Sequence, residues 1–324
     1  MKVLLVTDAW HPQVNGVVRT LSTIKRVLEA EGHQLEYVSP DQFLTVPCPT
    51  YSEIRLALNA GAGIKRRVEA FQPDAIHIAT EGPLGIAARK YCLRHGLAFT
   101  TAYHTKFPEY LNARFRIPKS WMYKWLRAFH APSAGVMVAT ASIRQELGDW
   151  GFTNLRQWSR GVDTDLFAPQ PKGWLKDPRP ISLYVGRVAV EKNIRAFLDL
   201  DIPGTKYVVG DGPRLDELRR NYPEAKFPGA KFGAELARYY ADADVFVFPS
   251  KTDTFGLVLL EALASGLPVA AYPVPGPLDV IGNTGVGVLN SNLALAVEGA
   301  LGISPEACRE YALRQTWQRT AHQF

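Results

Sequence analysis

Two carboxylates stand eight positions apart in the segment TDTFGLVLLEALASG, residues 252–266. Asp253 precedes a Phe255-Gly256 pair, and Glu261 lies within an apolar run. A carboxylate among apolar neighbours is costly unless it accepts hydrogen bonds. Glu261 could accept them from a backbone amide or an arginine, or from the vicinal hydroxyls of a ribose. Asp253, with the amides at Phe255 and Gly256, could face a second polyhydroxylated ring.

A pair of cations precedes this segment in the chain. Arg187 and Lys192 lie in YVGRVAVEKNIRAFL (184–198), between an expected strand and the start of an expected helix. Positive charge, backbone donors and the helix dipole together favour a diphosphate at such a place. Each cation alone could equally be an ordinary surface residue. The phosphate-loop pattern G-x-x-x-x-G-K-[ST] does not occur in the sequence.

A third candidate loop is DAWHPQVNGVVRTL, residues 8–21. Its Asn15-Gly16 pair permits a turn with positive φ at the start of a helix, where free N–H groups attract an anion. The loop is not G-x-G-x-x-G, so a hydride-transferring dinucleotide is not favoured. A plain glycine-containing loop is the alternative.

Short apolar runs alternate with amphipathic stretches along most of the chain, and this alternation predicts α/β domains with parallel sheets. The expected strands are 3–7, 35–39, 75–79, 97–102, 135–140, 181–186, 206–210, 244–250 and 267–272. The expected crossover helices are 18–31, 63–71, 84–95, 191–200 and 235–241.

A segment rich in proline, residues 168–180, interrupts the pattern and reads as an interdomain linker. We therefore expect two doubly wound, Rossmann-like domains, 1–168 and 178–304, which face each other across a ligand-binding cleft. Residues 305–324 should form a last helix that could pack back on the first domain.

Composition limits the class of protein. The sequence has 324 residues, of which 47% are hydrophobic, so two ordinary cores can form. No apolar run approaches the ~20 residues that cross a bilayer, and the first residues read as a buried strand, not a signal peptide. Three scattered cysteines suggest a reducing, cytoplasmic setting. Residues 1–168 hold 20 Lys and Arg against 14 Asp and Glu, which accounts for the whole net charge of +6.

The motifs together resemble the retaining glycosyltransferases of family 4, which have the GT-B fold. GRVAVEKN and TDTFGLVLLEALASGLPV carry the resemblance most strongly. NGVVRT, GVDTDLF, VVGDGPRLDEL and YADADVFVFPS match in the same order, so it covers most of the chain. The nearest members are the GDP-mannose-dependent α-mannosyltransferases and related enzymes that act on membrane lipids.

The resemblance implies a role for each nucleotide-binding residue. Gly16 would lie beside the donor diphosphate, and Arg187 and Lys192 would neutralise that diphosphate as it leaves. Glu261 would bind the ribose.

The resemblance also implies which residues hold the donor sugar. Asp253 would do so together with Phe255 and Gly256. His104, in the segment TAYHTKFPEYL, would contact the sugar and align the acceptor. The family pattern has glutamate where this chain has Asp253, and one methylene less shortens the reach by roughly an ångström. The preferred donor sugar is thus left open.

A metal is not expected. Asp242 and Asp244 are the closest to a paired motif, but their place before a core strand suggests caps or solvated residues. Protein cations, not magnesium, would then stabilise the leaving nucleotide. By analogy with the family, the acceptor attacks from the leaving-group side and a phosphate oxygen takes its proton.

The acceptor is suggested by RFRIPKSWMYKWLRAFHAP, residues 114–132, which contains five cations and no acid. On a helix, one arc would collect Trp121, Met122, Trp125, Leu126 and Phe129, with the cations outside it. Such a helix suits an anionic membrane surface, although the arc could also belong to the core.

The function that follows is transfer of a mannose-type or glucose-type hexose from a nucleotide diphosphate sugar to a membrane lipid or lipid-linked acceptor. The enzyme would be cytoplasmic and peripheral on the inner face of the membrane, and nucleic acid is not an expected partner. A soluble polysaccharide or small polyol acceptor is one alternative. A catalytically inactive nucleotide-sugar-binding protein is the other.

Overall fold

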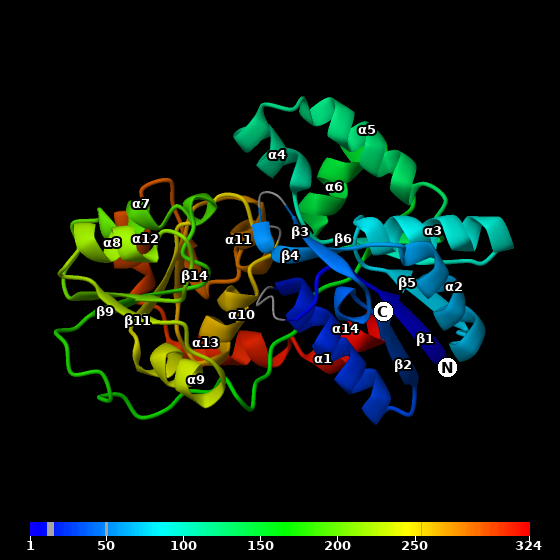
Figure 1. Ribbon diagram of the computed structural model, residues 1–324. Coiled ribbons are helices and arrows are strands. Elements are labelled where there is room, and N and C mark those ends of the chain that lie inside the picture. The colour runs from blue at the N-terminus through cyan, green and yellow to red at the C-terminus, as the bar shows by residue number, and fades with distance from the viewer. Residues whose placement is uncertain (12–15, 49–50, 254) are drawn as a thin grey trace. The chain divides into compact units, whose positions relative to one another are not determined.

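The computed structural model describes residues 1–11, 16–48, 51–253 and 255–324. The chain forms two compact units. Unit 1 contains Met1–Ser159 and Thr320–Phe324, and unit 2 contains Arg160–Arg319. Figure 1 follows the chain from blue to red and labels the elements of both units.

Unit 1 is built on a six-stranded parallel sheet in the order β2-β1-β5-β6-β7-β8. These strands are β1 (Lys2–Val6), β2 (Gln34–Val38), β5 (Ala75–Ile78), β6 (Thr100–Tyr103), β7 (Gly135–Val138) and β8 (Leu155–Gln157). An antiparallel hairpin, β3 (Thr45–Cys48) and β4 (Tyr51–Ala57), interrupts the alternation. The helices are α1 (Gly16–Ala30), η1 (Pro40–Gln42), α2 (Ala60–Phe71), α3 (Pro83–His95), α4 (Phe107–Phe115), α5 (Lys119–His130) and α6 (Ala141–Asp149).

Unit 2 has a second six-stranded parallel sheet, in the order β11-β10-β9-β12-β13-β14. These strands are β9 (Ile181–Val185), β10 (Thr205–Val209), β11 (Lys226–Gly229), β12 (Val245–Phe248), β13 (Val269–Ala271) and β14 (Gly287–Leu289). The helices are η2 (Val190–Lys192), α7 (Ile194–Leu198), α8 (Leu215–Asn221), α9 (Gly233–Asp242), α10 (Leu257–Ala264), α11 (Pro275–Val280), α12 (Leu293–Ala300) and α13 (Pro305–Leu313). The last helix, α14 (Trp317–Gln323), begins in unit 2 and ends in unit 1. The strand order is that of the doubly wound Rossmann fold.

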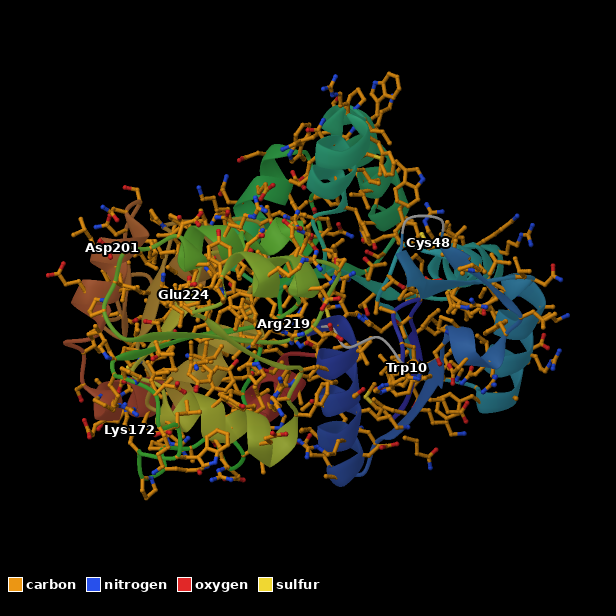
Figure 2. The ribbon with its side chains drawn as sticks, turned by 60° about the vertical axis from the view of Figure 1, so that its left-hand side comes forward. Trp10, Cys48, Lys172, Asp201, Arg219 and Glu224 are labelled. Carbon is orange, nitrogen blue, oxygen red and sulfur yellow. The ribbon has the colours of Figure 1, made fainter. Side chains whose placement is uncertain are left out.

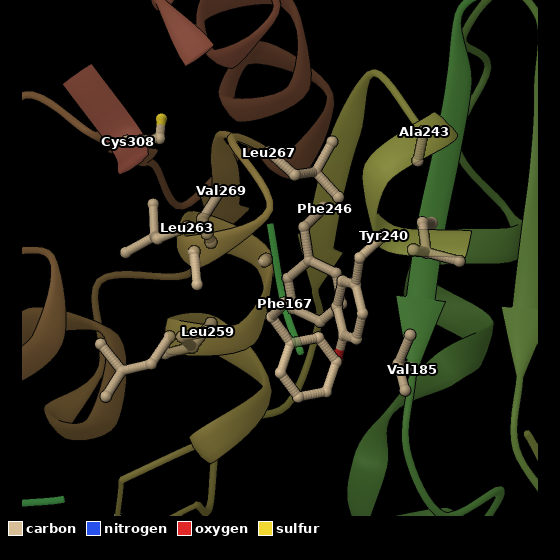
Figure 3. Close-up of a cluster of buried hydrophobic side chains, with 14 of the residues drawn as sticks. Phe167, Val185, Tyr240, Ala243, Phe246, Leu259, Leu263, Leu267, Val269 and Cys308 are labelled. Carbon is tan, nitrogen blue, oxygen red and sulfur yellow. The ribbon is translucent and has the colours of Figure 1, made fainter. Parts of the chain in front are cut away.

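The core of unit 2 explains why the central strands are apolar on both faces. Figure 3 shows Phe167, Tyr240 and Phe246 packed together beside α10. The rings of Phe167 and Tyr240 meet edge to face at 5.5 Å between centroids. A strand covered on both faces reads as a continuous apolar run, and this is the pattern that predicted β9 and β12. The prediction of two parallel α/β units is confirmed.

The proline-rich segment 168–180 is held firmly to unit 2. Asp242 accepts a hydrogen bond from the amide of Gly173 at 2.6 Å, and Asp244 accepts one from Lys172 at 2.6 Å. Figure 2 labels Lys172 on this unit.

Arg309 of α13 donates to the carbonyls of Thr164 and Phe167, at 2.9 and 2.7 Å. Residues 160–168 therefore lie in unit 2, whereas the sequence pattern placed them in the first domain.

The C-terminal segment forms two helices, where one was expected. α14 begins in unit 2, and the chain ends in unit 1, near β1 and β2 in Figure 1. Phe324 packs its ring 4.9 Å from that of His77 and 5.1 Å from that of Trp158. The indole N–H of Trp158 donates to the carbonyl of Thr320 at 3.1 Å.

Candidate active site

The sheet of unit 2 has a topological switch point between β9 and β12. These strands pair in parallel, with Ser182 opposite Val245, although they are far apart in sequence. In a doubly wound sheet, the connections from two such strands leave on opposite sides, which opens a crevice beyond their carboxyl ends. Ligands of open α/β sheets bind in such crevices. Both candidate segments of unit 2 follow one of these two strands.

The two loops at the switch point are tied to each other. The amide of the Asn193 side chain donates to the carbonyl of Pro249 at 3.1 Å. The hydroxyl of Thr252 donates to the carbonyl of Glu191 at 3.4 Å. Asn193 adopts φ +53°, a left-handed conformation that asparagine tolerates, and it ends η2 immediately after Lys192. The position of Lys192 is thereby fixed relative to the loop that follows β12.

The loop after β10 makes a close backbone contact with the loop after β9. Gly210 and Gly212 follow β10, with φ near +155°. A Cβ atom on Gly210 would lie 1.8 Å from the carbonyl oxygen of Gly186, and one on Gly212 would lie 2.4 Å from that of Val188. Only glycine permits this approach.

Lys192 and Asp253 form an ion pair across the switch point. Both side chains are mostly buried, and the second carboxylate oxygen of Asp253 has no hydrogen-bond partner among the described residues. A buried acceptor without a partner is a group that a ligand hydroxyl can satisfy. The structure thus places a cation and a carboxylate, each able to bind part of a sugar nucleotide, in direct contact.

Three other predicted residues of unit 2 lie on the same two loops as Lys192 and Asp253. Arg187 follows β9 and is exposed, while its carbonyl accepts from the buried Tyr184 hydroxyl at 2.9 Å. Gly256 has φ +85° and precedes α10. Phe255 is half-buried against the core of unit 2, and its neighbour Thr254 lies outside the described residues.

Glu261 is almost completely buried, with 2% of its surface exposed. Its carboxylate accepts a hydrogen bond at 2.9 Å from the hydroxyl of Tyr240, which lies on α9. The sequence suggested an amide, an arginine or a ribose as partner, and a tyrosine was not foreseen. Binding of a ribose by Glu261 remains a prediction.

The candidate residues of unit 1 follow β1 and β6. Gly16 is the first residue of α1, and Pro12–Asn15, which precede it in that predicted anion loop, lie outside the described residues. His104 follows β6 directly and is half-buried, with its ring centroid 5.9 Å from that of Trp158. The proposed contacts of both residues with a donor remain predictions.

No role for Asp8, which lies just after β1, was predicted from the sequence. Its carboxylate accepts from the amide of Leu84 at 2.9 Å and from the hydroxyl of Thr80 at 2.8 Å. It therefore caps the start of α3, and burial raises its pKa despite these bonds. A side chain on Gly82 would collide with this carboxylate.

Helix α5 divides the residues that the sequence placed on one arc. Leu126 and Phe129 are buried in unit 1, whereas Trp121 and Trp125 are 71% and 44% exposed. The arc is therefore divided: Leu126 and Phe129 belong to the core, which was the alternative, and the two tryptophans face solvent. Among the described residues, no helix is both long and apolar enough to span a bilayer.

The fold and the switch-point site define a two-domain glycosyltransferase of the GT-B type. Residues 14–166 match the family described as Glycosyltransferase Family 4, and residues 179–301 match Glycosyl transferases group 1. The chain belongs to glycosyltransferase family 4 and is a hexosyltransferase.

Individual relatives agree with this assignment. A GDP-mannose-dependent alpha-mannosyltransferase of Mycobacterium tuberculosis is 31% identical, over 87% of this chain and 81% of its own. An alpha-monoglucosyldiacylglycerol synthase of Streptococcus pneumoniae is 27% identical, over 100% of this chain and 83% of its own. The structure of a sucrose-phosphate synthase from Thermosynechococcus elongatus superposes with a TM-score of 0.78 at 22% identity, over 99% of this chain and 96% of its own, and shows the same fold.

Proposed function

We propose that this protein transfers a hexose, with retention of anomeric configuration, from a nucleotide diphosphate sugar to a membrane lipid or lipid-linked acceptor, without a metal ion. The names of two relatives, one GDP-mannose-dependent and one a glucosyldiacylglycerol synthase, support this donor class and this acceptor class. GDP-mannose is therefore the first donor to test.

The observation that carries the proposal is the contact between Lys192 and Asp253 beyond β9 and β12. A sugar nucleotide needs a cation for its diphosphate and a hydrogen-bond acceptor for the hydroxyl groups of its sugar. Lys192 provides the first and Asp253 the second, and Arg187 lies on the same loop as Lys192. The donor would thus bind with its phosphates toward Lys192 and Arg187.

In the proposed reaction the bond between the anomeric carbon and the diphosphate oxygen breaks, and negative charge develops on the diphosphate. Lys192 and Arg187 stabilise that charge, and loss of one such group costs about 3–4 kcal/mol of transition-state stabilisation. The acceptor hydroxyl attacks from the same face, and a diphosphate oxygen takes its proton. His104 orients the sugar and the acceptor.

The exposed side of α5 supports a membrane-bound acceptor. Trp121 and Trp125 are exposed there, and Lys124, three residues from Trp121 on the helix, is exposed as well. Tryptophan rings favour the headgroup region, and each cation near an anionic surface contributes about 1 kcal/mol. We infer that the enzyme acts peripherally at the inner, cytoplasmic face of a membrane.

The test combines transfer with vesicle binding. Purified enzyme, radiolabelled GDP-mannose and UDP-glucose, and vesicles with or without anionic lipid are incubated, and label is followed into the lipid phase. We expect lipid-soluble product only with anionic vesicles, and reduced binding in high salt or in the Trp121→Ala/Trp125→Ala variant. Label that enters only soluble glucans or polyols would replace the lipid acceptor by a soluble one.

A further inference from the structure

The segment that follows β6 makes a tight turn directly after His104. The amide of Phe107 donates to the carbonyl of Thr105 at 2.8 Å. Lys106, the central residue, has φ −73° and ψ 59°. These values define an inverse γ-turn, a turn that a single central residue determines. Whatever holds Lys106 therefore also fixes the chain that leaves His104.

Lys106, which precedes α4, is held by a carboxylate on helix α6. Its side chain is only 11% exposed, and its ammonium lies 2.5 Å from a carboxylate oxygen of Glu146 on α6. The other carboxylate oxygen of Glu146 lies 3.1 Å from the hydroxyl of Tyr123 on α5. Burial raises the pKa of Tyr123, so this hydroxyl remains a neutral donor.

The same tyrosine reaches a second carboxylate. Its hydroxyl lies 3.0 Å from Glu109 on α4, and Lys119 lies 3.5 Å from that carboxylate. A hydroxyl has one proton, so Tyr123 donates to Glu109 or to Glu146 at any moment. Two ammonium groups thus balance two carboxylates around one buried hydroxyl, and the set joins the His104 turn to α4, α5 and α6. Figure 1 shows these three helices together within unit 1.

The ion pair between Lys106 and Glu146 differs from an ordinary surface ion pair in its burial. Lys65 and Glu69 form such a pair, 3.8 Å apart, with more than half of each side chain exposed. Exposed pairs contribute little, because water solvates either partner when the other is removed. Removal of Lys106 would instead leave the carboxylate of Glu146, whose side chain is only 29% exposed, without its counter-ion.

We propose that Lys106 and Glu146 are positioning residues for hexosyl transfer: their ion pair holds the γ-turn after β6 and thereby fixes the imidazole of His104. This inference rests on the proposed function, in which His104 orients sugar and acceptor. Neither residue contacts the donor in this role. They act on the turnover step through His104 and leave donor affinity unchanged.

The experiment compares Lys106→Met, Glu146→Gln and His104→Ala with the surface control Lys65→Met. We expect Lys106→Met to lower kcat at least tenfold, while its affinity for GDP and its KM for the donor change less than twofold. Lys106→Arg, which keeps the charge, should retain kcat within threefold of wild type. Lys65→Met should behave as wild type.

The double variant Lys106→Met/His104→Ala gives the decisive readout. Since Lys106 acts through His104, the double variant should turn over no more slowly than His104→Ala alone. Multiplicative losses, or wild-type kcat in Lys106→Met, would overturn the inference. If Lys106→Met does not fold, Glu146→Gln, which keeps the shape of the side chain, takes its place in the same cycle. Absence of transfer by the wild-type enzyme would instead overturn the proposed function.

Discussion

The ion pair between Lys192 and Asp253 leads to a prediction about the product of the reaction. In the free enzyme the ammonium that is proposed to hold the diphosphate already contacts a carboxylate. A nucleoside diphosphate must share that ammonium with Asp253, and the two anions repel each other. Asp253→Asn removes the repulsion. Free GDP, or whichever nucleoside diphosphate the enzyme uses, should therefore bind the variant more tightly than wild type.

The size of the effect follows from the geometry. Two anions that contact one ammonium lie on the order of 5 Å apart, where a unit-charge pair interacts with about 3 kcal/mol at an effective dielectric constant of 20. Both side chains are partly exposed, at 21% and 17%, so screening reduces the repulsion. We expect about 1–2 kcal/mol, or a roughly five- to thirtyfold lower Kd for the diphosphate.

Transfer should change in the opposite direction. The unpaired oxygen of Asp253 is the proposed acceptor for a sugar hydroxyl, and a hydrogen bond to a charged group contributes about 1.5–3 kcal/mol. Asp253→Asn should therefore lower kcat/KM about ten- to hundredfold. Slower release of the diphosphate product would lower kcat further.

Isothermal titration calorimetry of wild type, Asp253→Asn and the control Asp201→Asn measures the first effect, and initial rates measure the second. Asp201 is an exposed carboxylate of unit 2, so its variant controls for loss of one negative charge (Figure 2). An Asp253→Asn variant that binds the diphosphate as weakly as wild type would refute the reasoning, as would an equal gain in Asp201→Asn.

Three further predictions concern stability and thiol chemistry. Burial acts to raise the pKa of Asp244, but its ion pairs and an amide outweigh this and hold it below the usual value. The ionised carboxylate therefore stabilises the fold above about pH 4, and this stabilisation is lost as the pH falls. In urea unfolding, Asp244→Asn should lower the free energy of unfolding by about 1–3 kcal/mol at pH 7 and equal wild type in strong acid. A loss that does not depend on pH would contradict this. Burial raises the pKa of Cys308 to about 12 and of Cys92 to about 11. At pH 8 a disulfide reagent should therefore modify only the half-exposed Cys48 in the native protein, and rapid reaction of a second cysteine would be evidence against this. Gly210→Ala should lower the free energy of unfolding by more than about 2 kcal/mol, because its Cβ would overlap a carbonyl, and an unchanged melting temperature would argue otherwise.

The central strands could be predicted from the sequence because burial on both faces demands apolar residues. All nine expected strands form, from β1 to β13. The strands that escaped prediction are the sheet-edge strands β8, β11 and β14, along with the hairpin β3-β4. An edge strand needs fewer apolar residues, and β11 reads KFPG, with a proline and a glycine that usually argue against a strand.

The segment 168–180 could not be placed from local sequence. Its prolines are typical of a linker, yet carboxylates more than sixty positions away hold it to unit 2. The interpretation of Asp242 and Asp244 as caps or solvated residues missed that they hold this segment, because hydrogen bonds between residues so far apart in sequence leave no local pattern. The first domain was predicted to end at residue 168, whereas the first stretch of unit 1 ends at Ser159.

The candidate site was partly visible in the sequence. The motifs assigned the cations after one strand and the acid after another to the same donor, but the direct contact of Lys192 with Asp253 was not predicted. The partner of Glu261 could not be foreseen, because Tyr240 lies on another helix. Lys106 gave no signal beside His104, since a single lysine in a loop usually lies in solvent. Its burial depends on a carboxylate forty positions further along the chain.

The central claim is that Lys192 binds the diphosphate of a sugar nucleotide. The most direct test is the melting temperature of wild type and Lys192→Met with GDP-, UDP- and ADP-sugars at graded concentrations. A ligand at about 100 times its Kd stabilises the native state by about 2.7 kcal/mol, so a true donor shifts the transition measurably. We predict that one donor raises the melting temperature of wild type, and that Lys192→Met needs at least tenfold more of it for the same shift. An equal shift in both proteins, or no shift with any sugar nucleotide, would contradict the account.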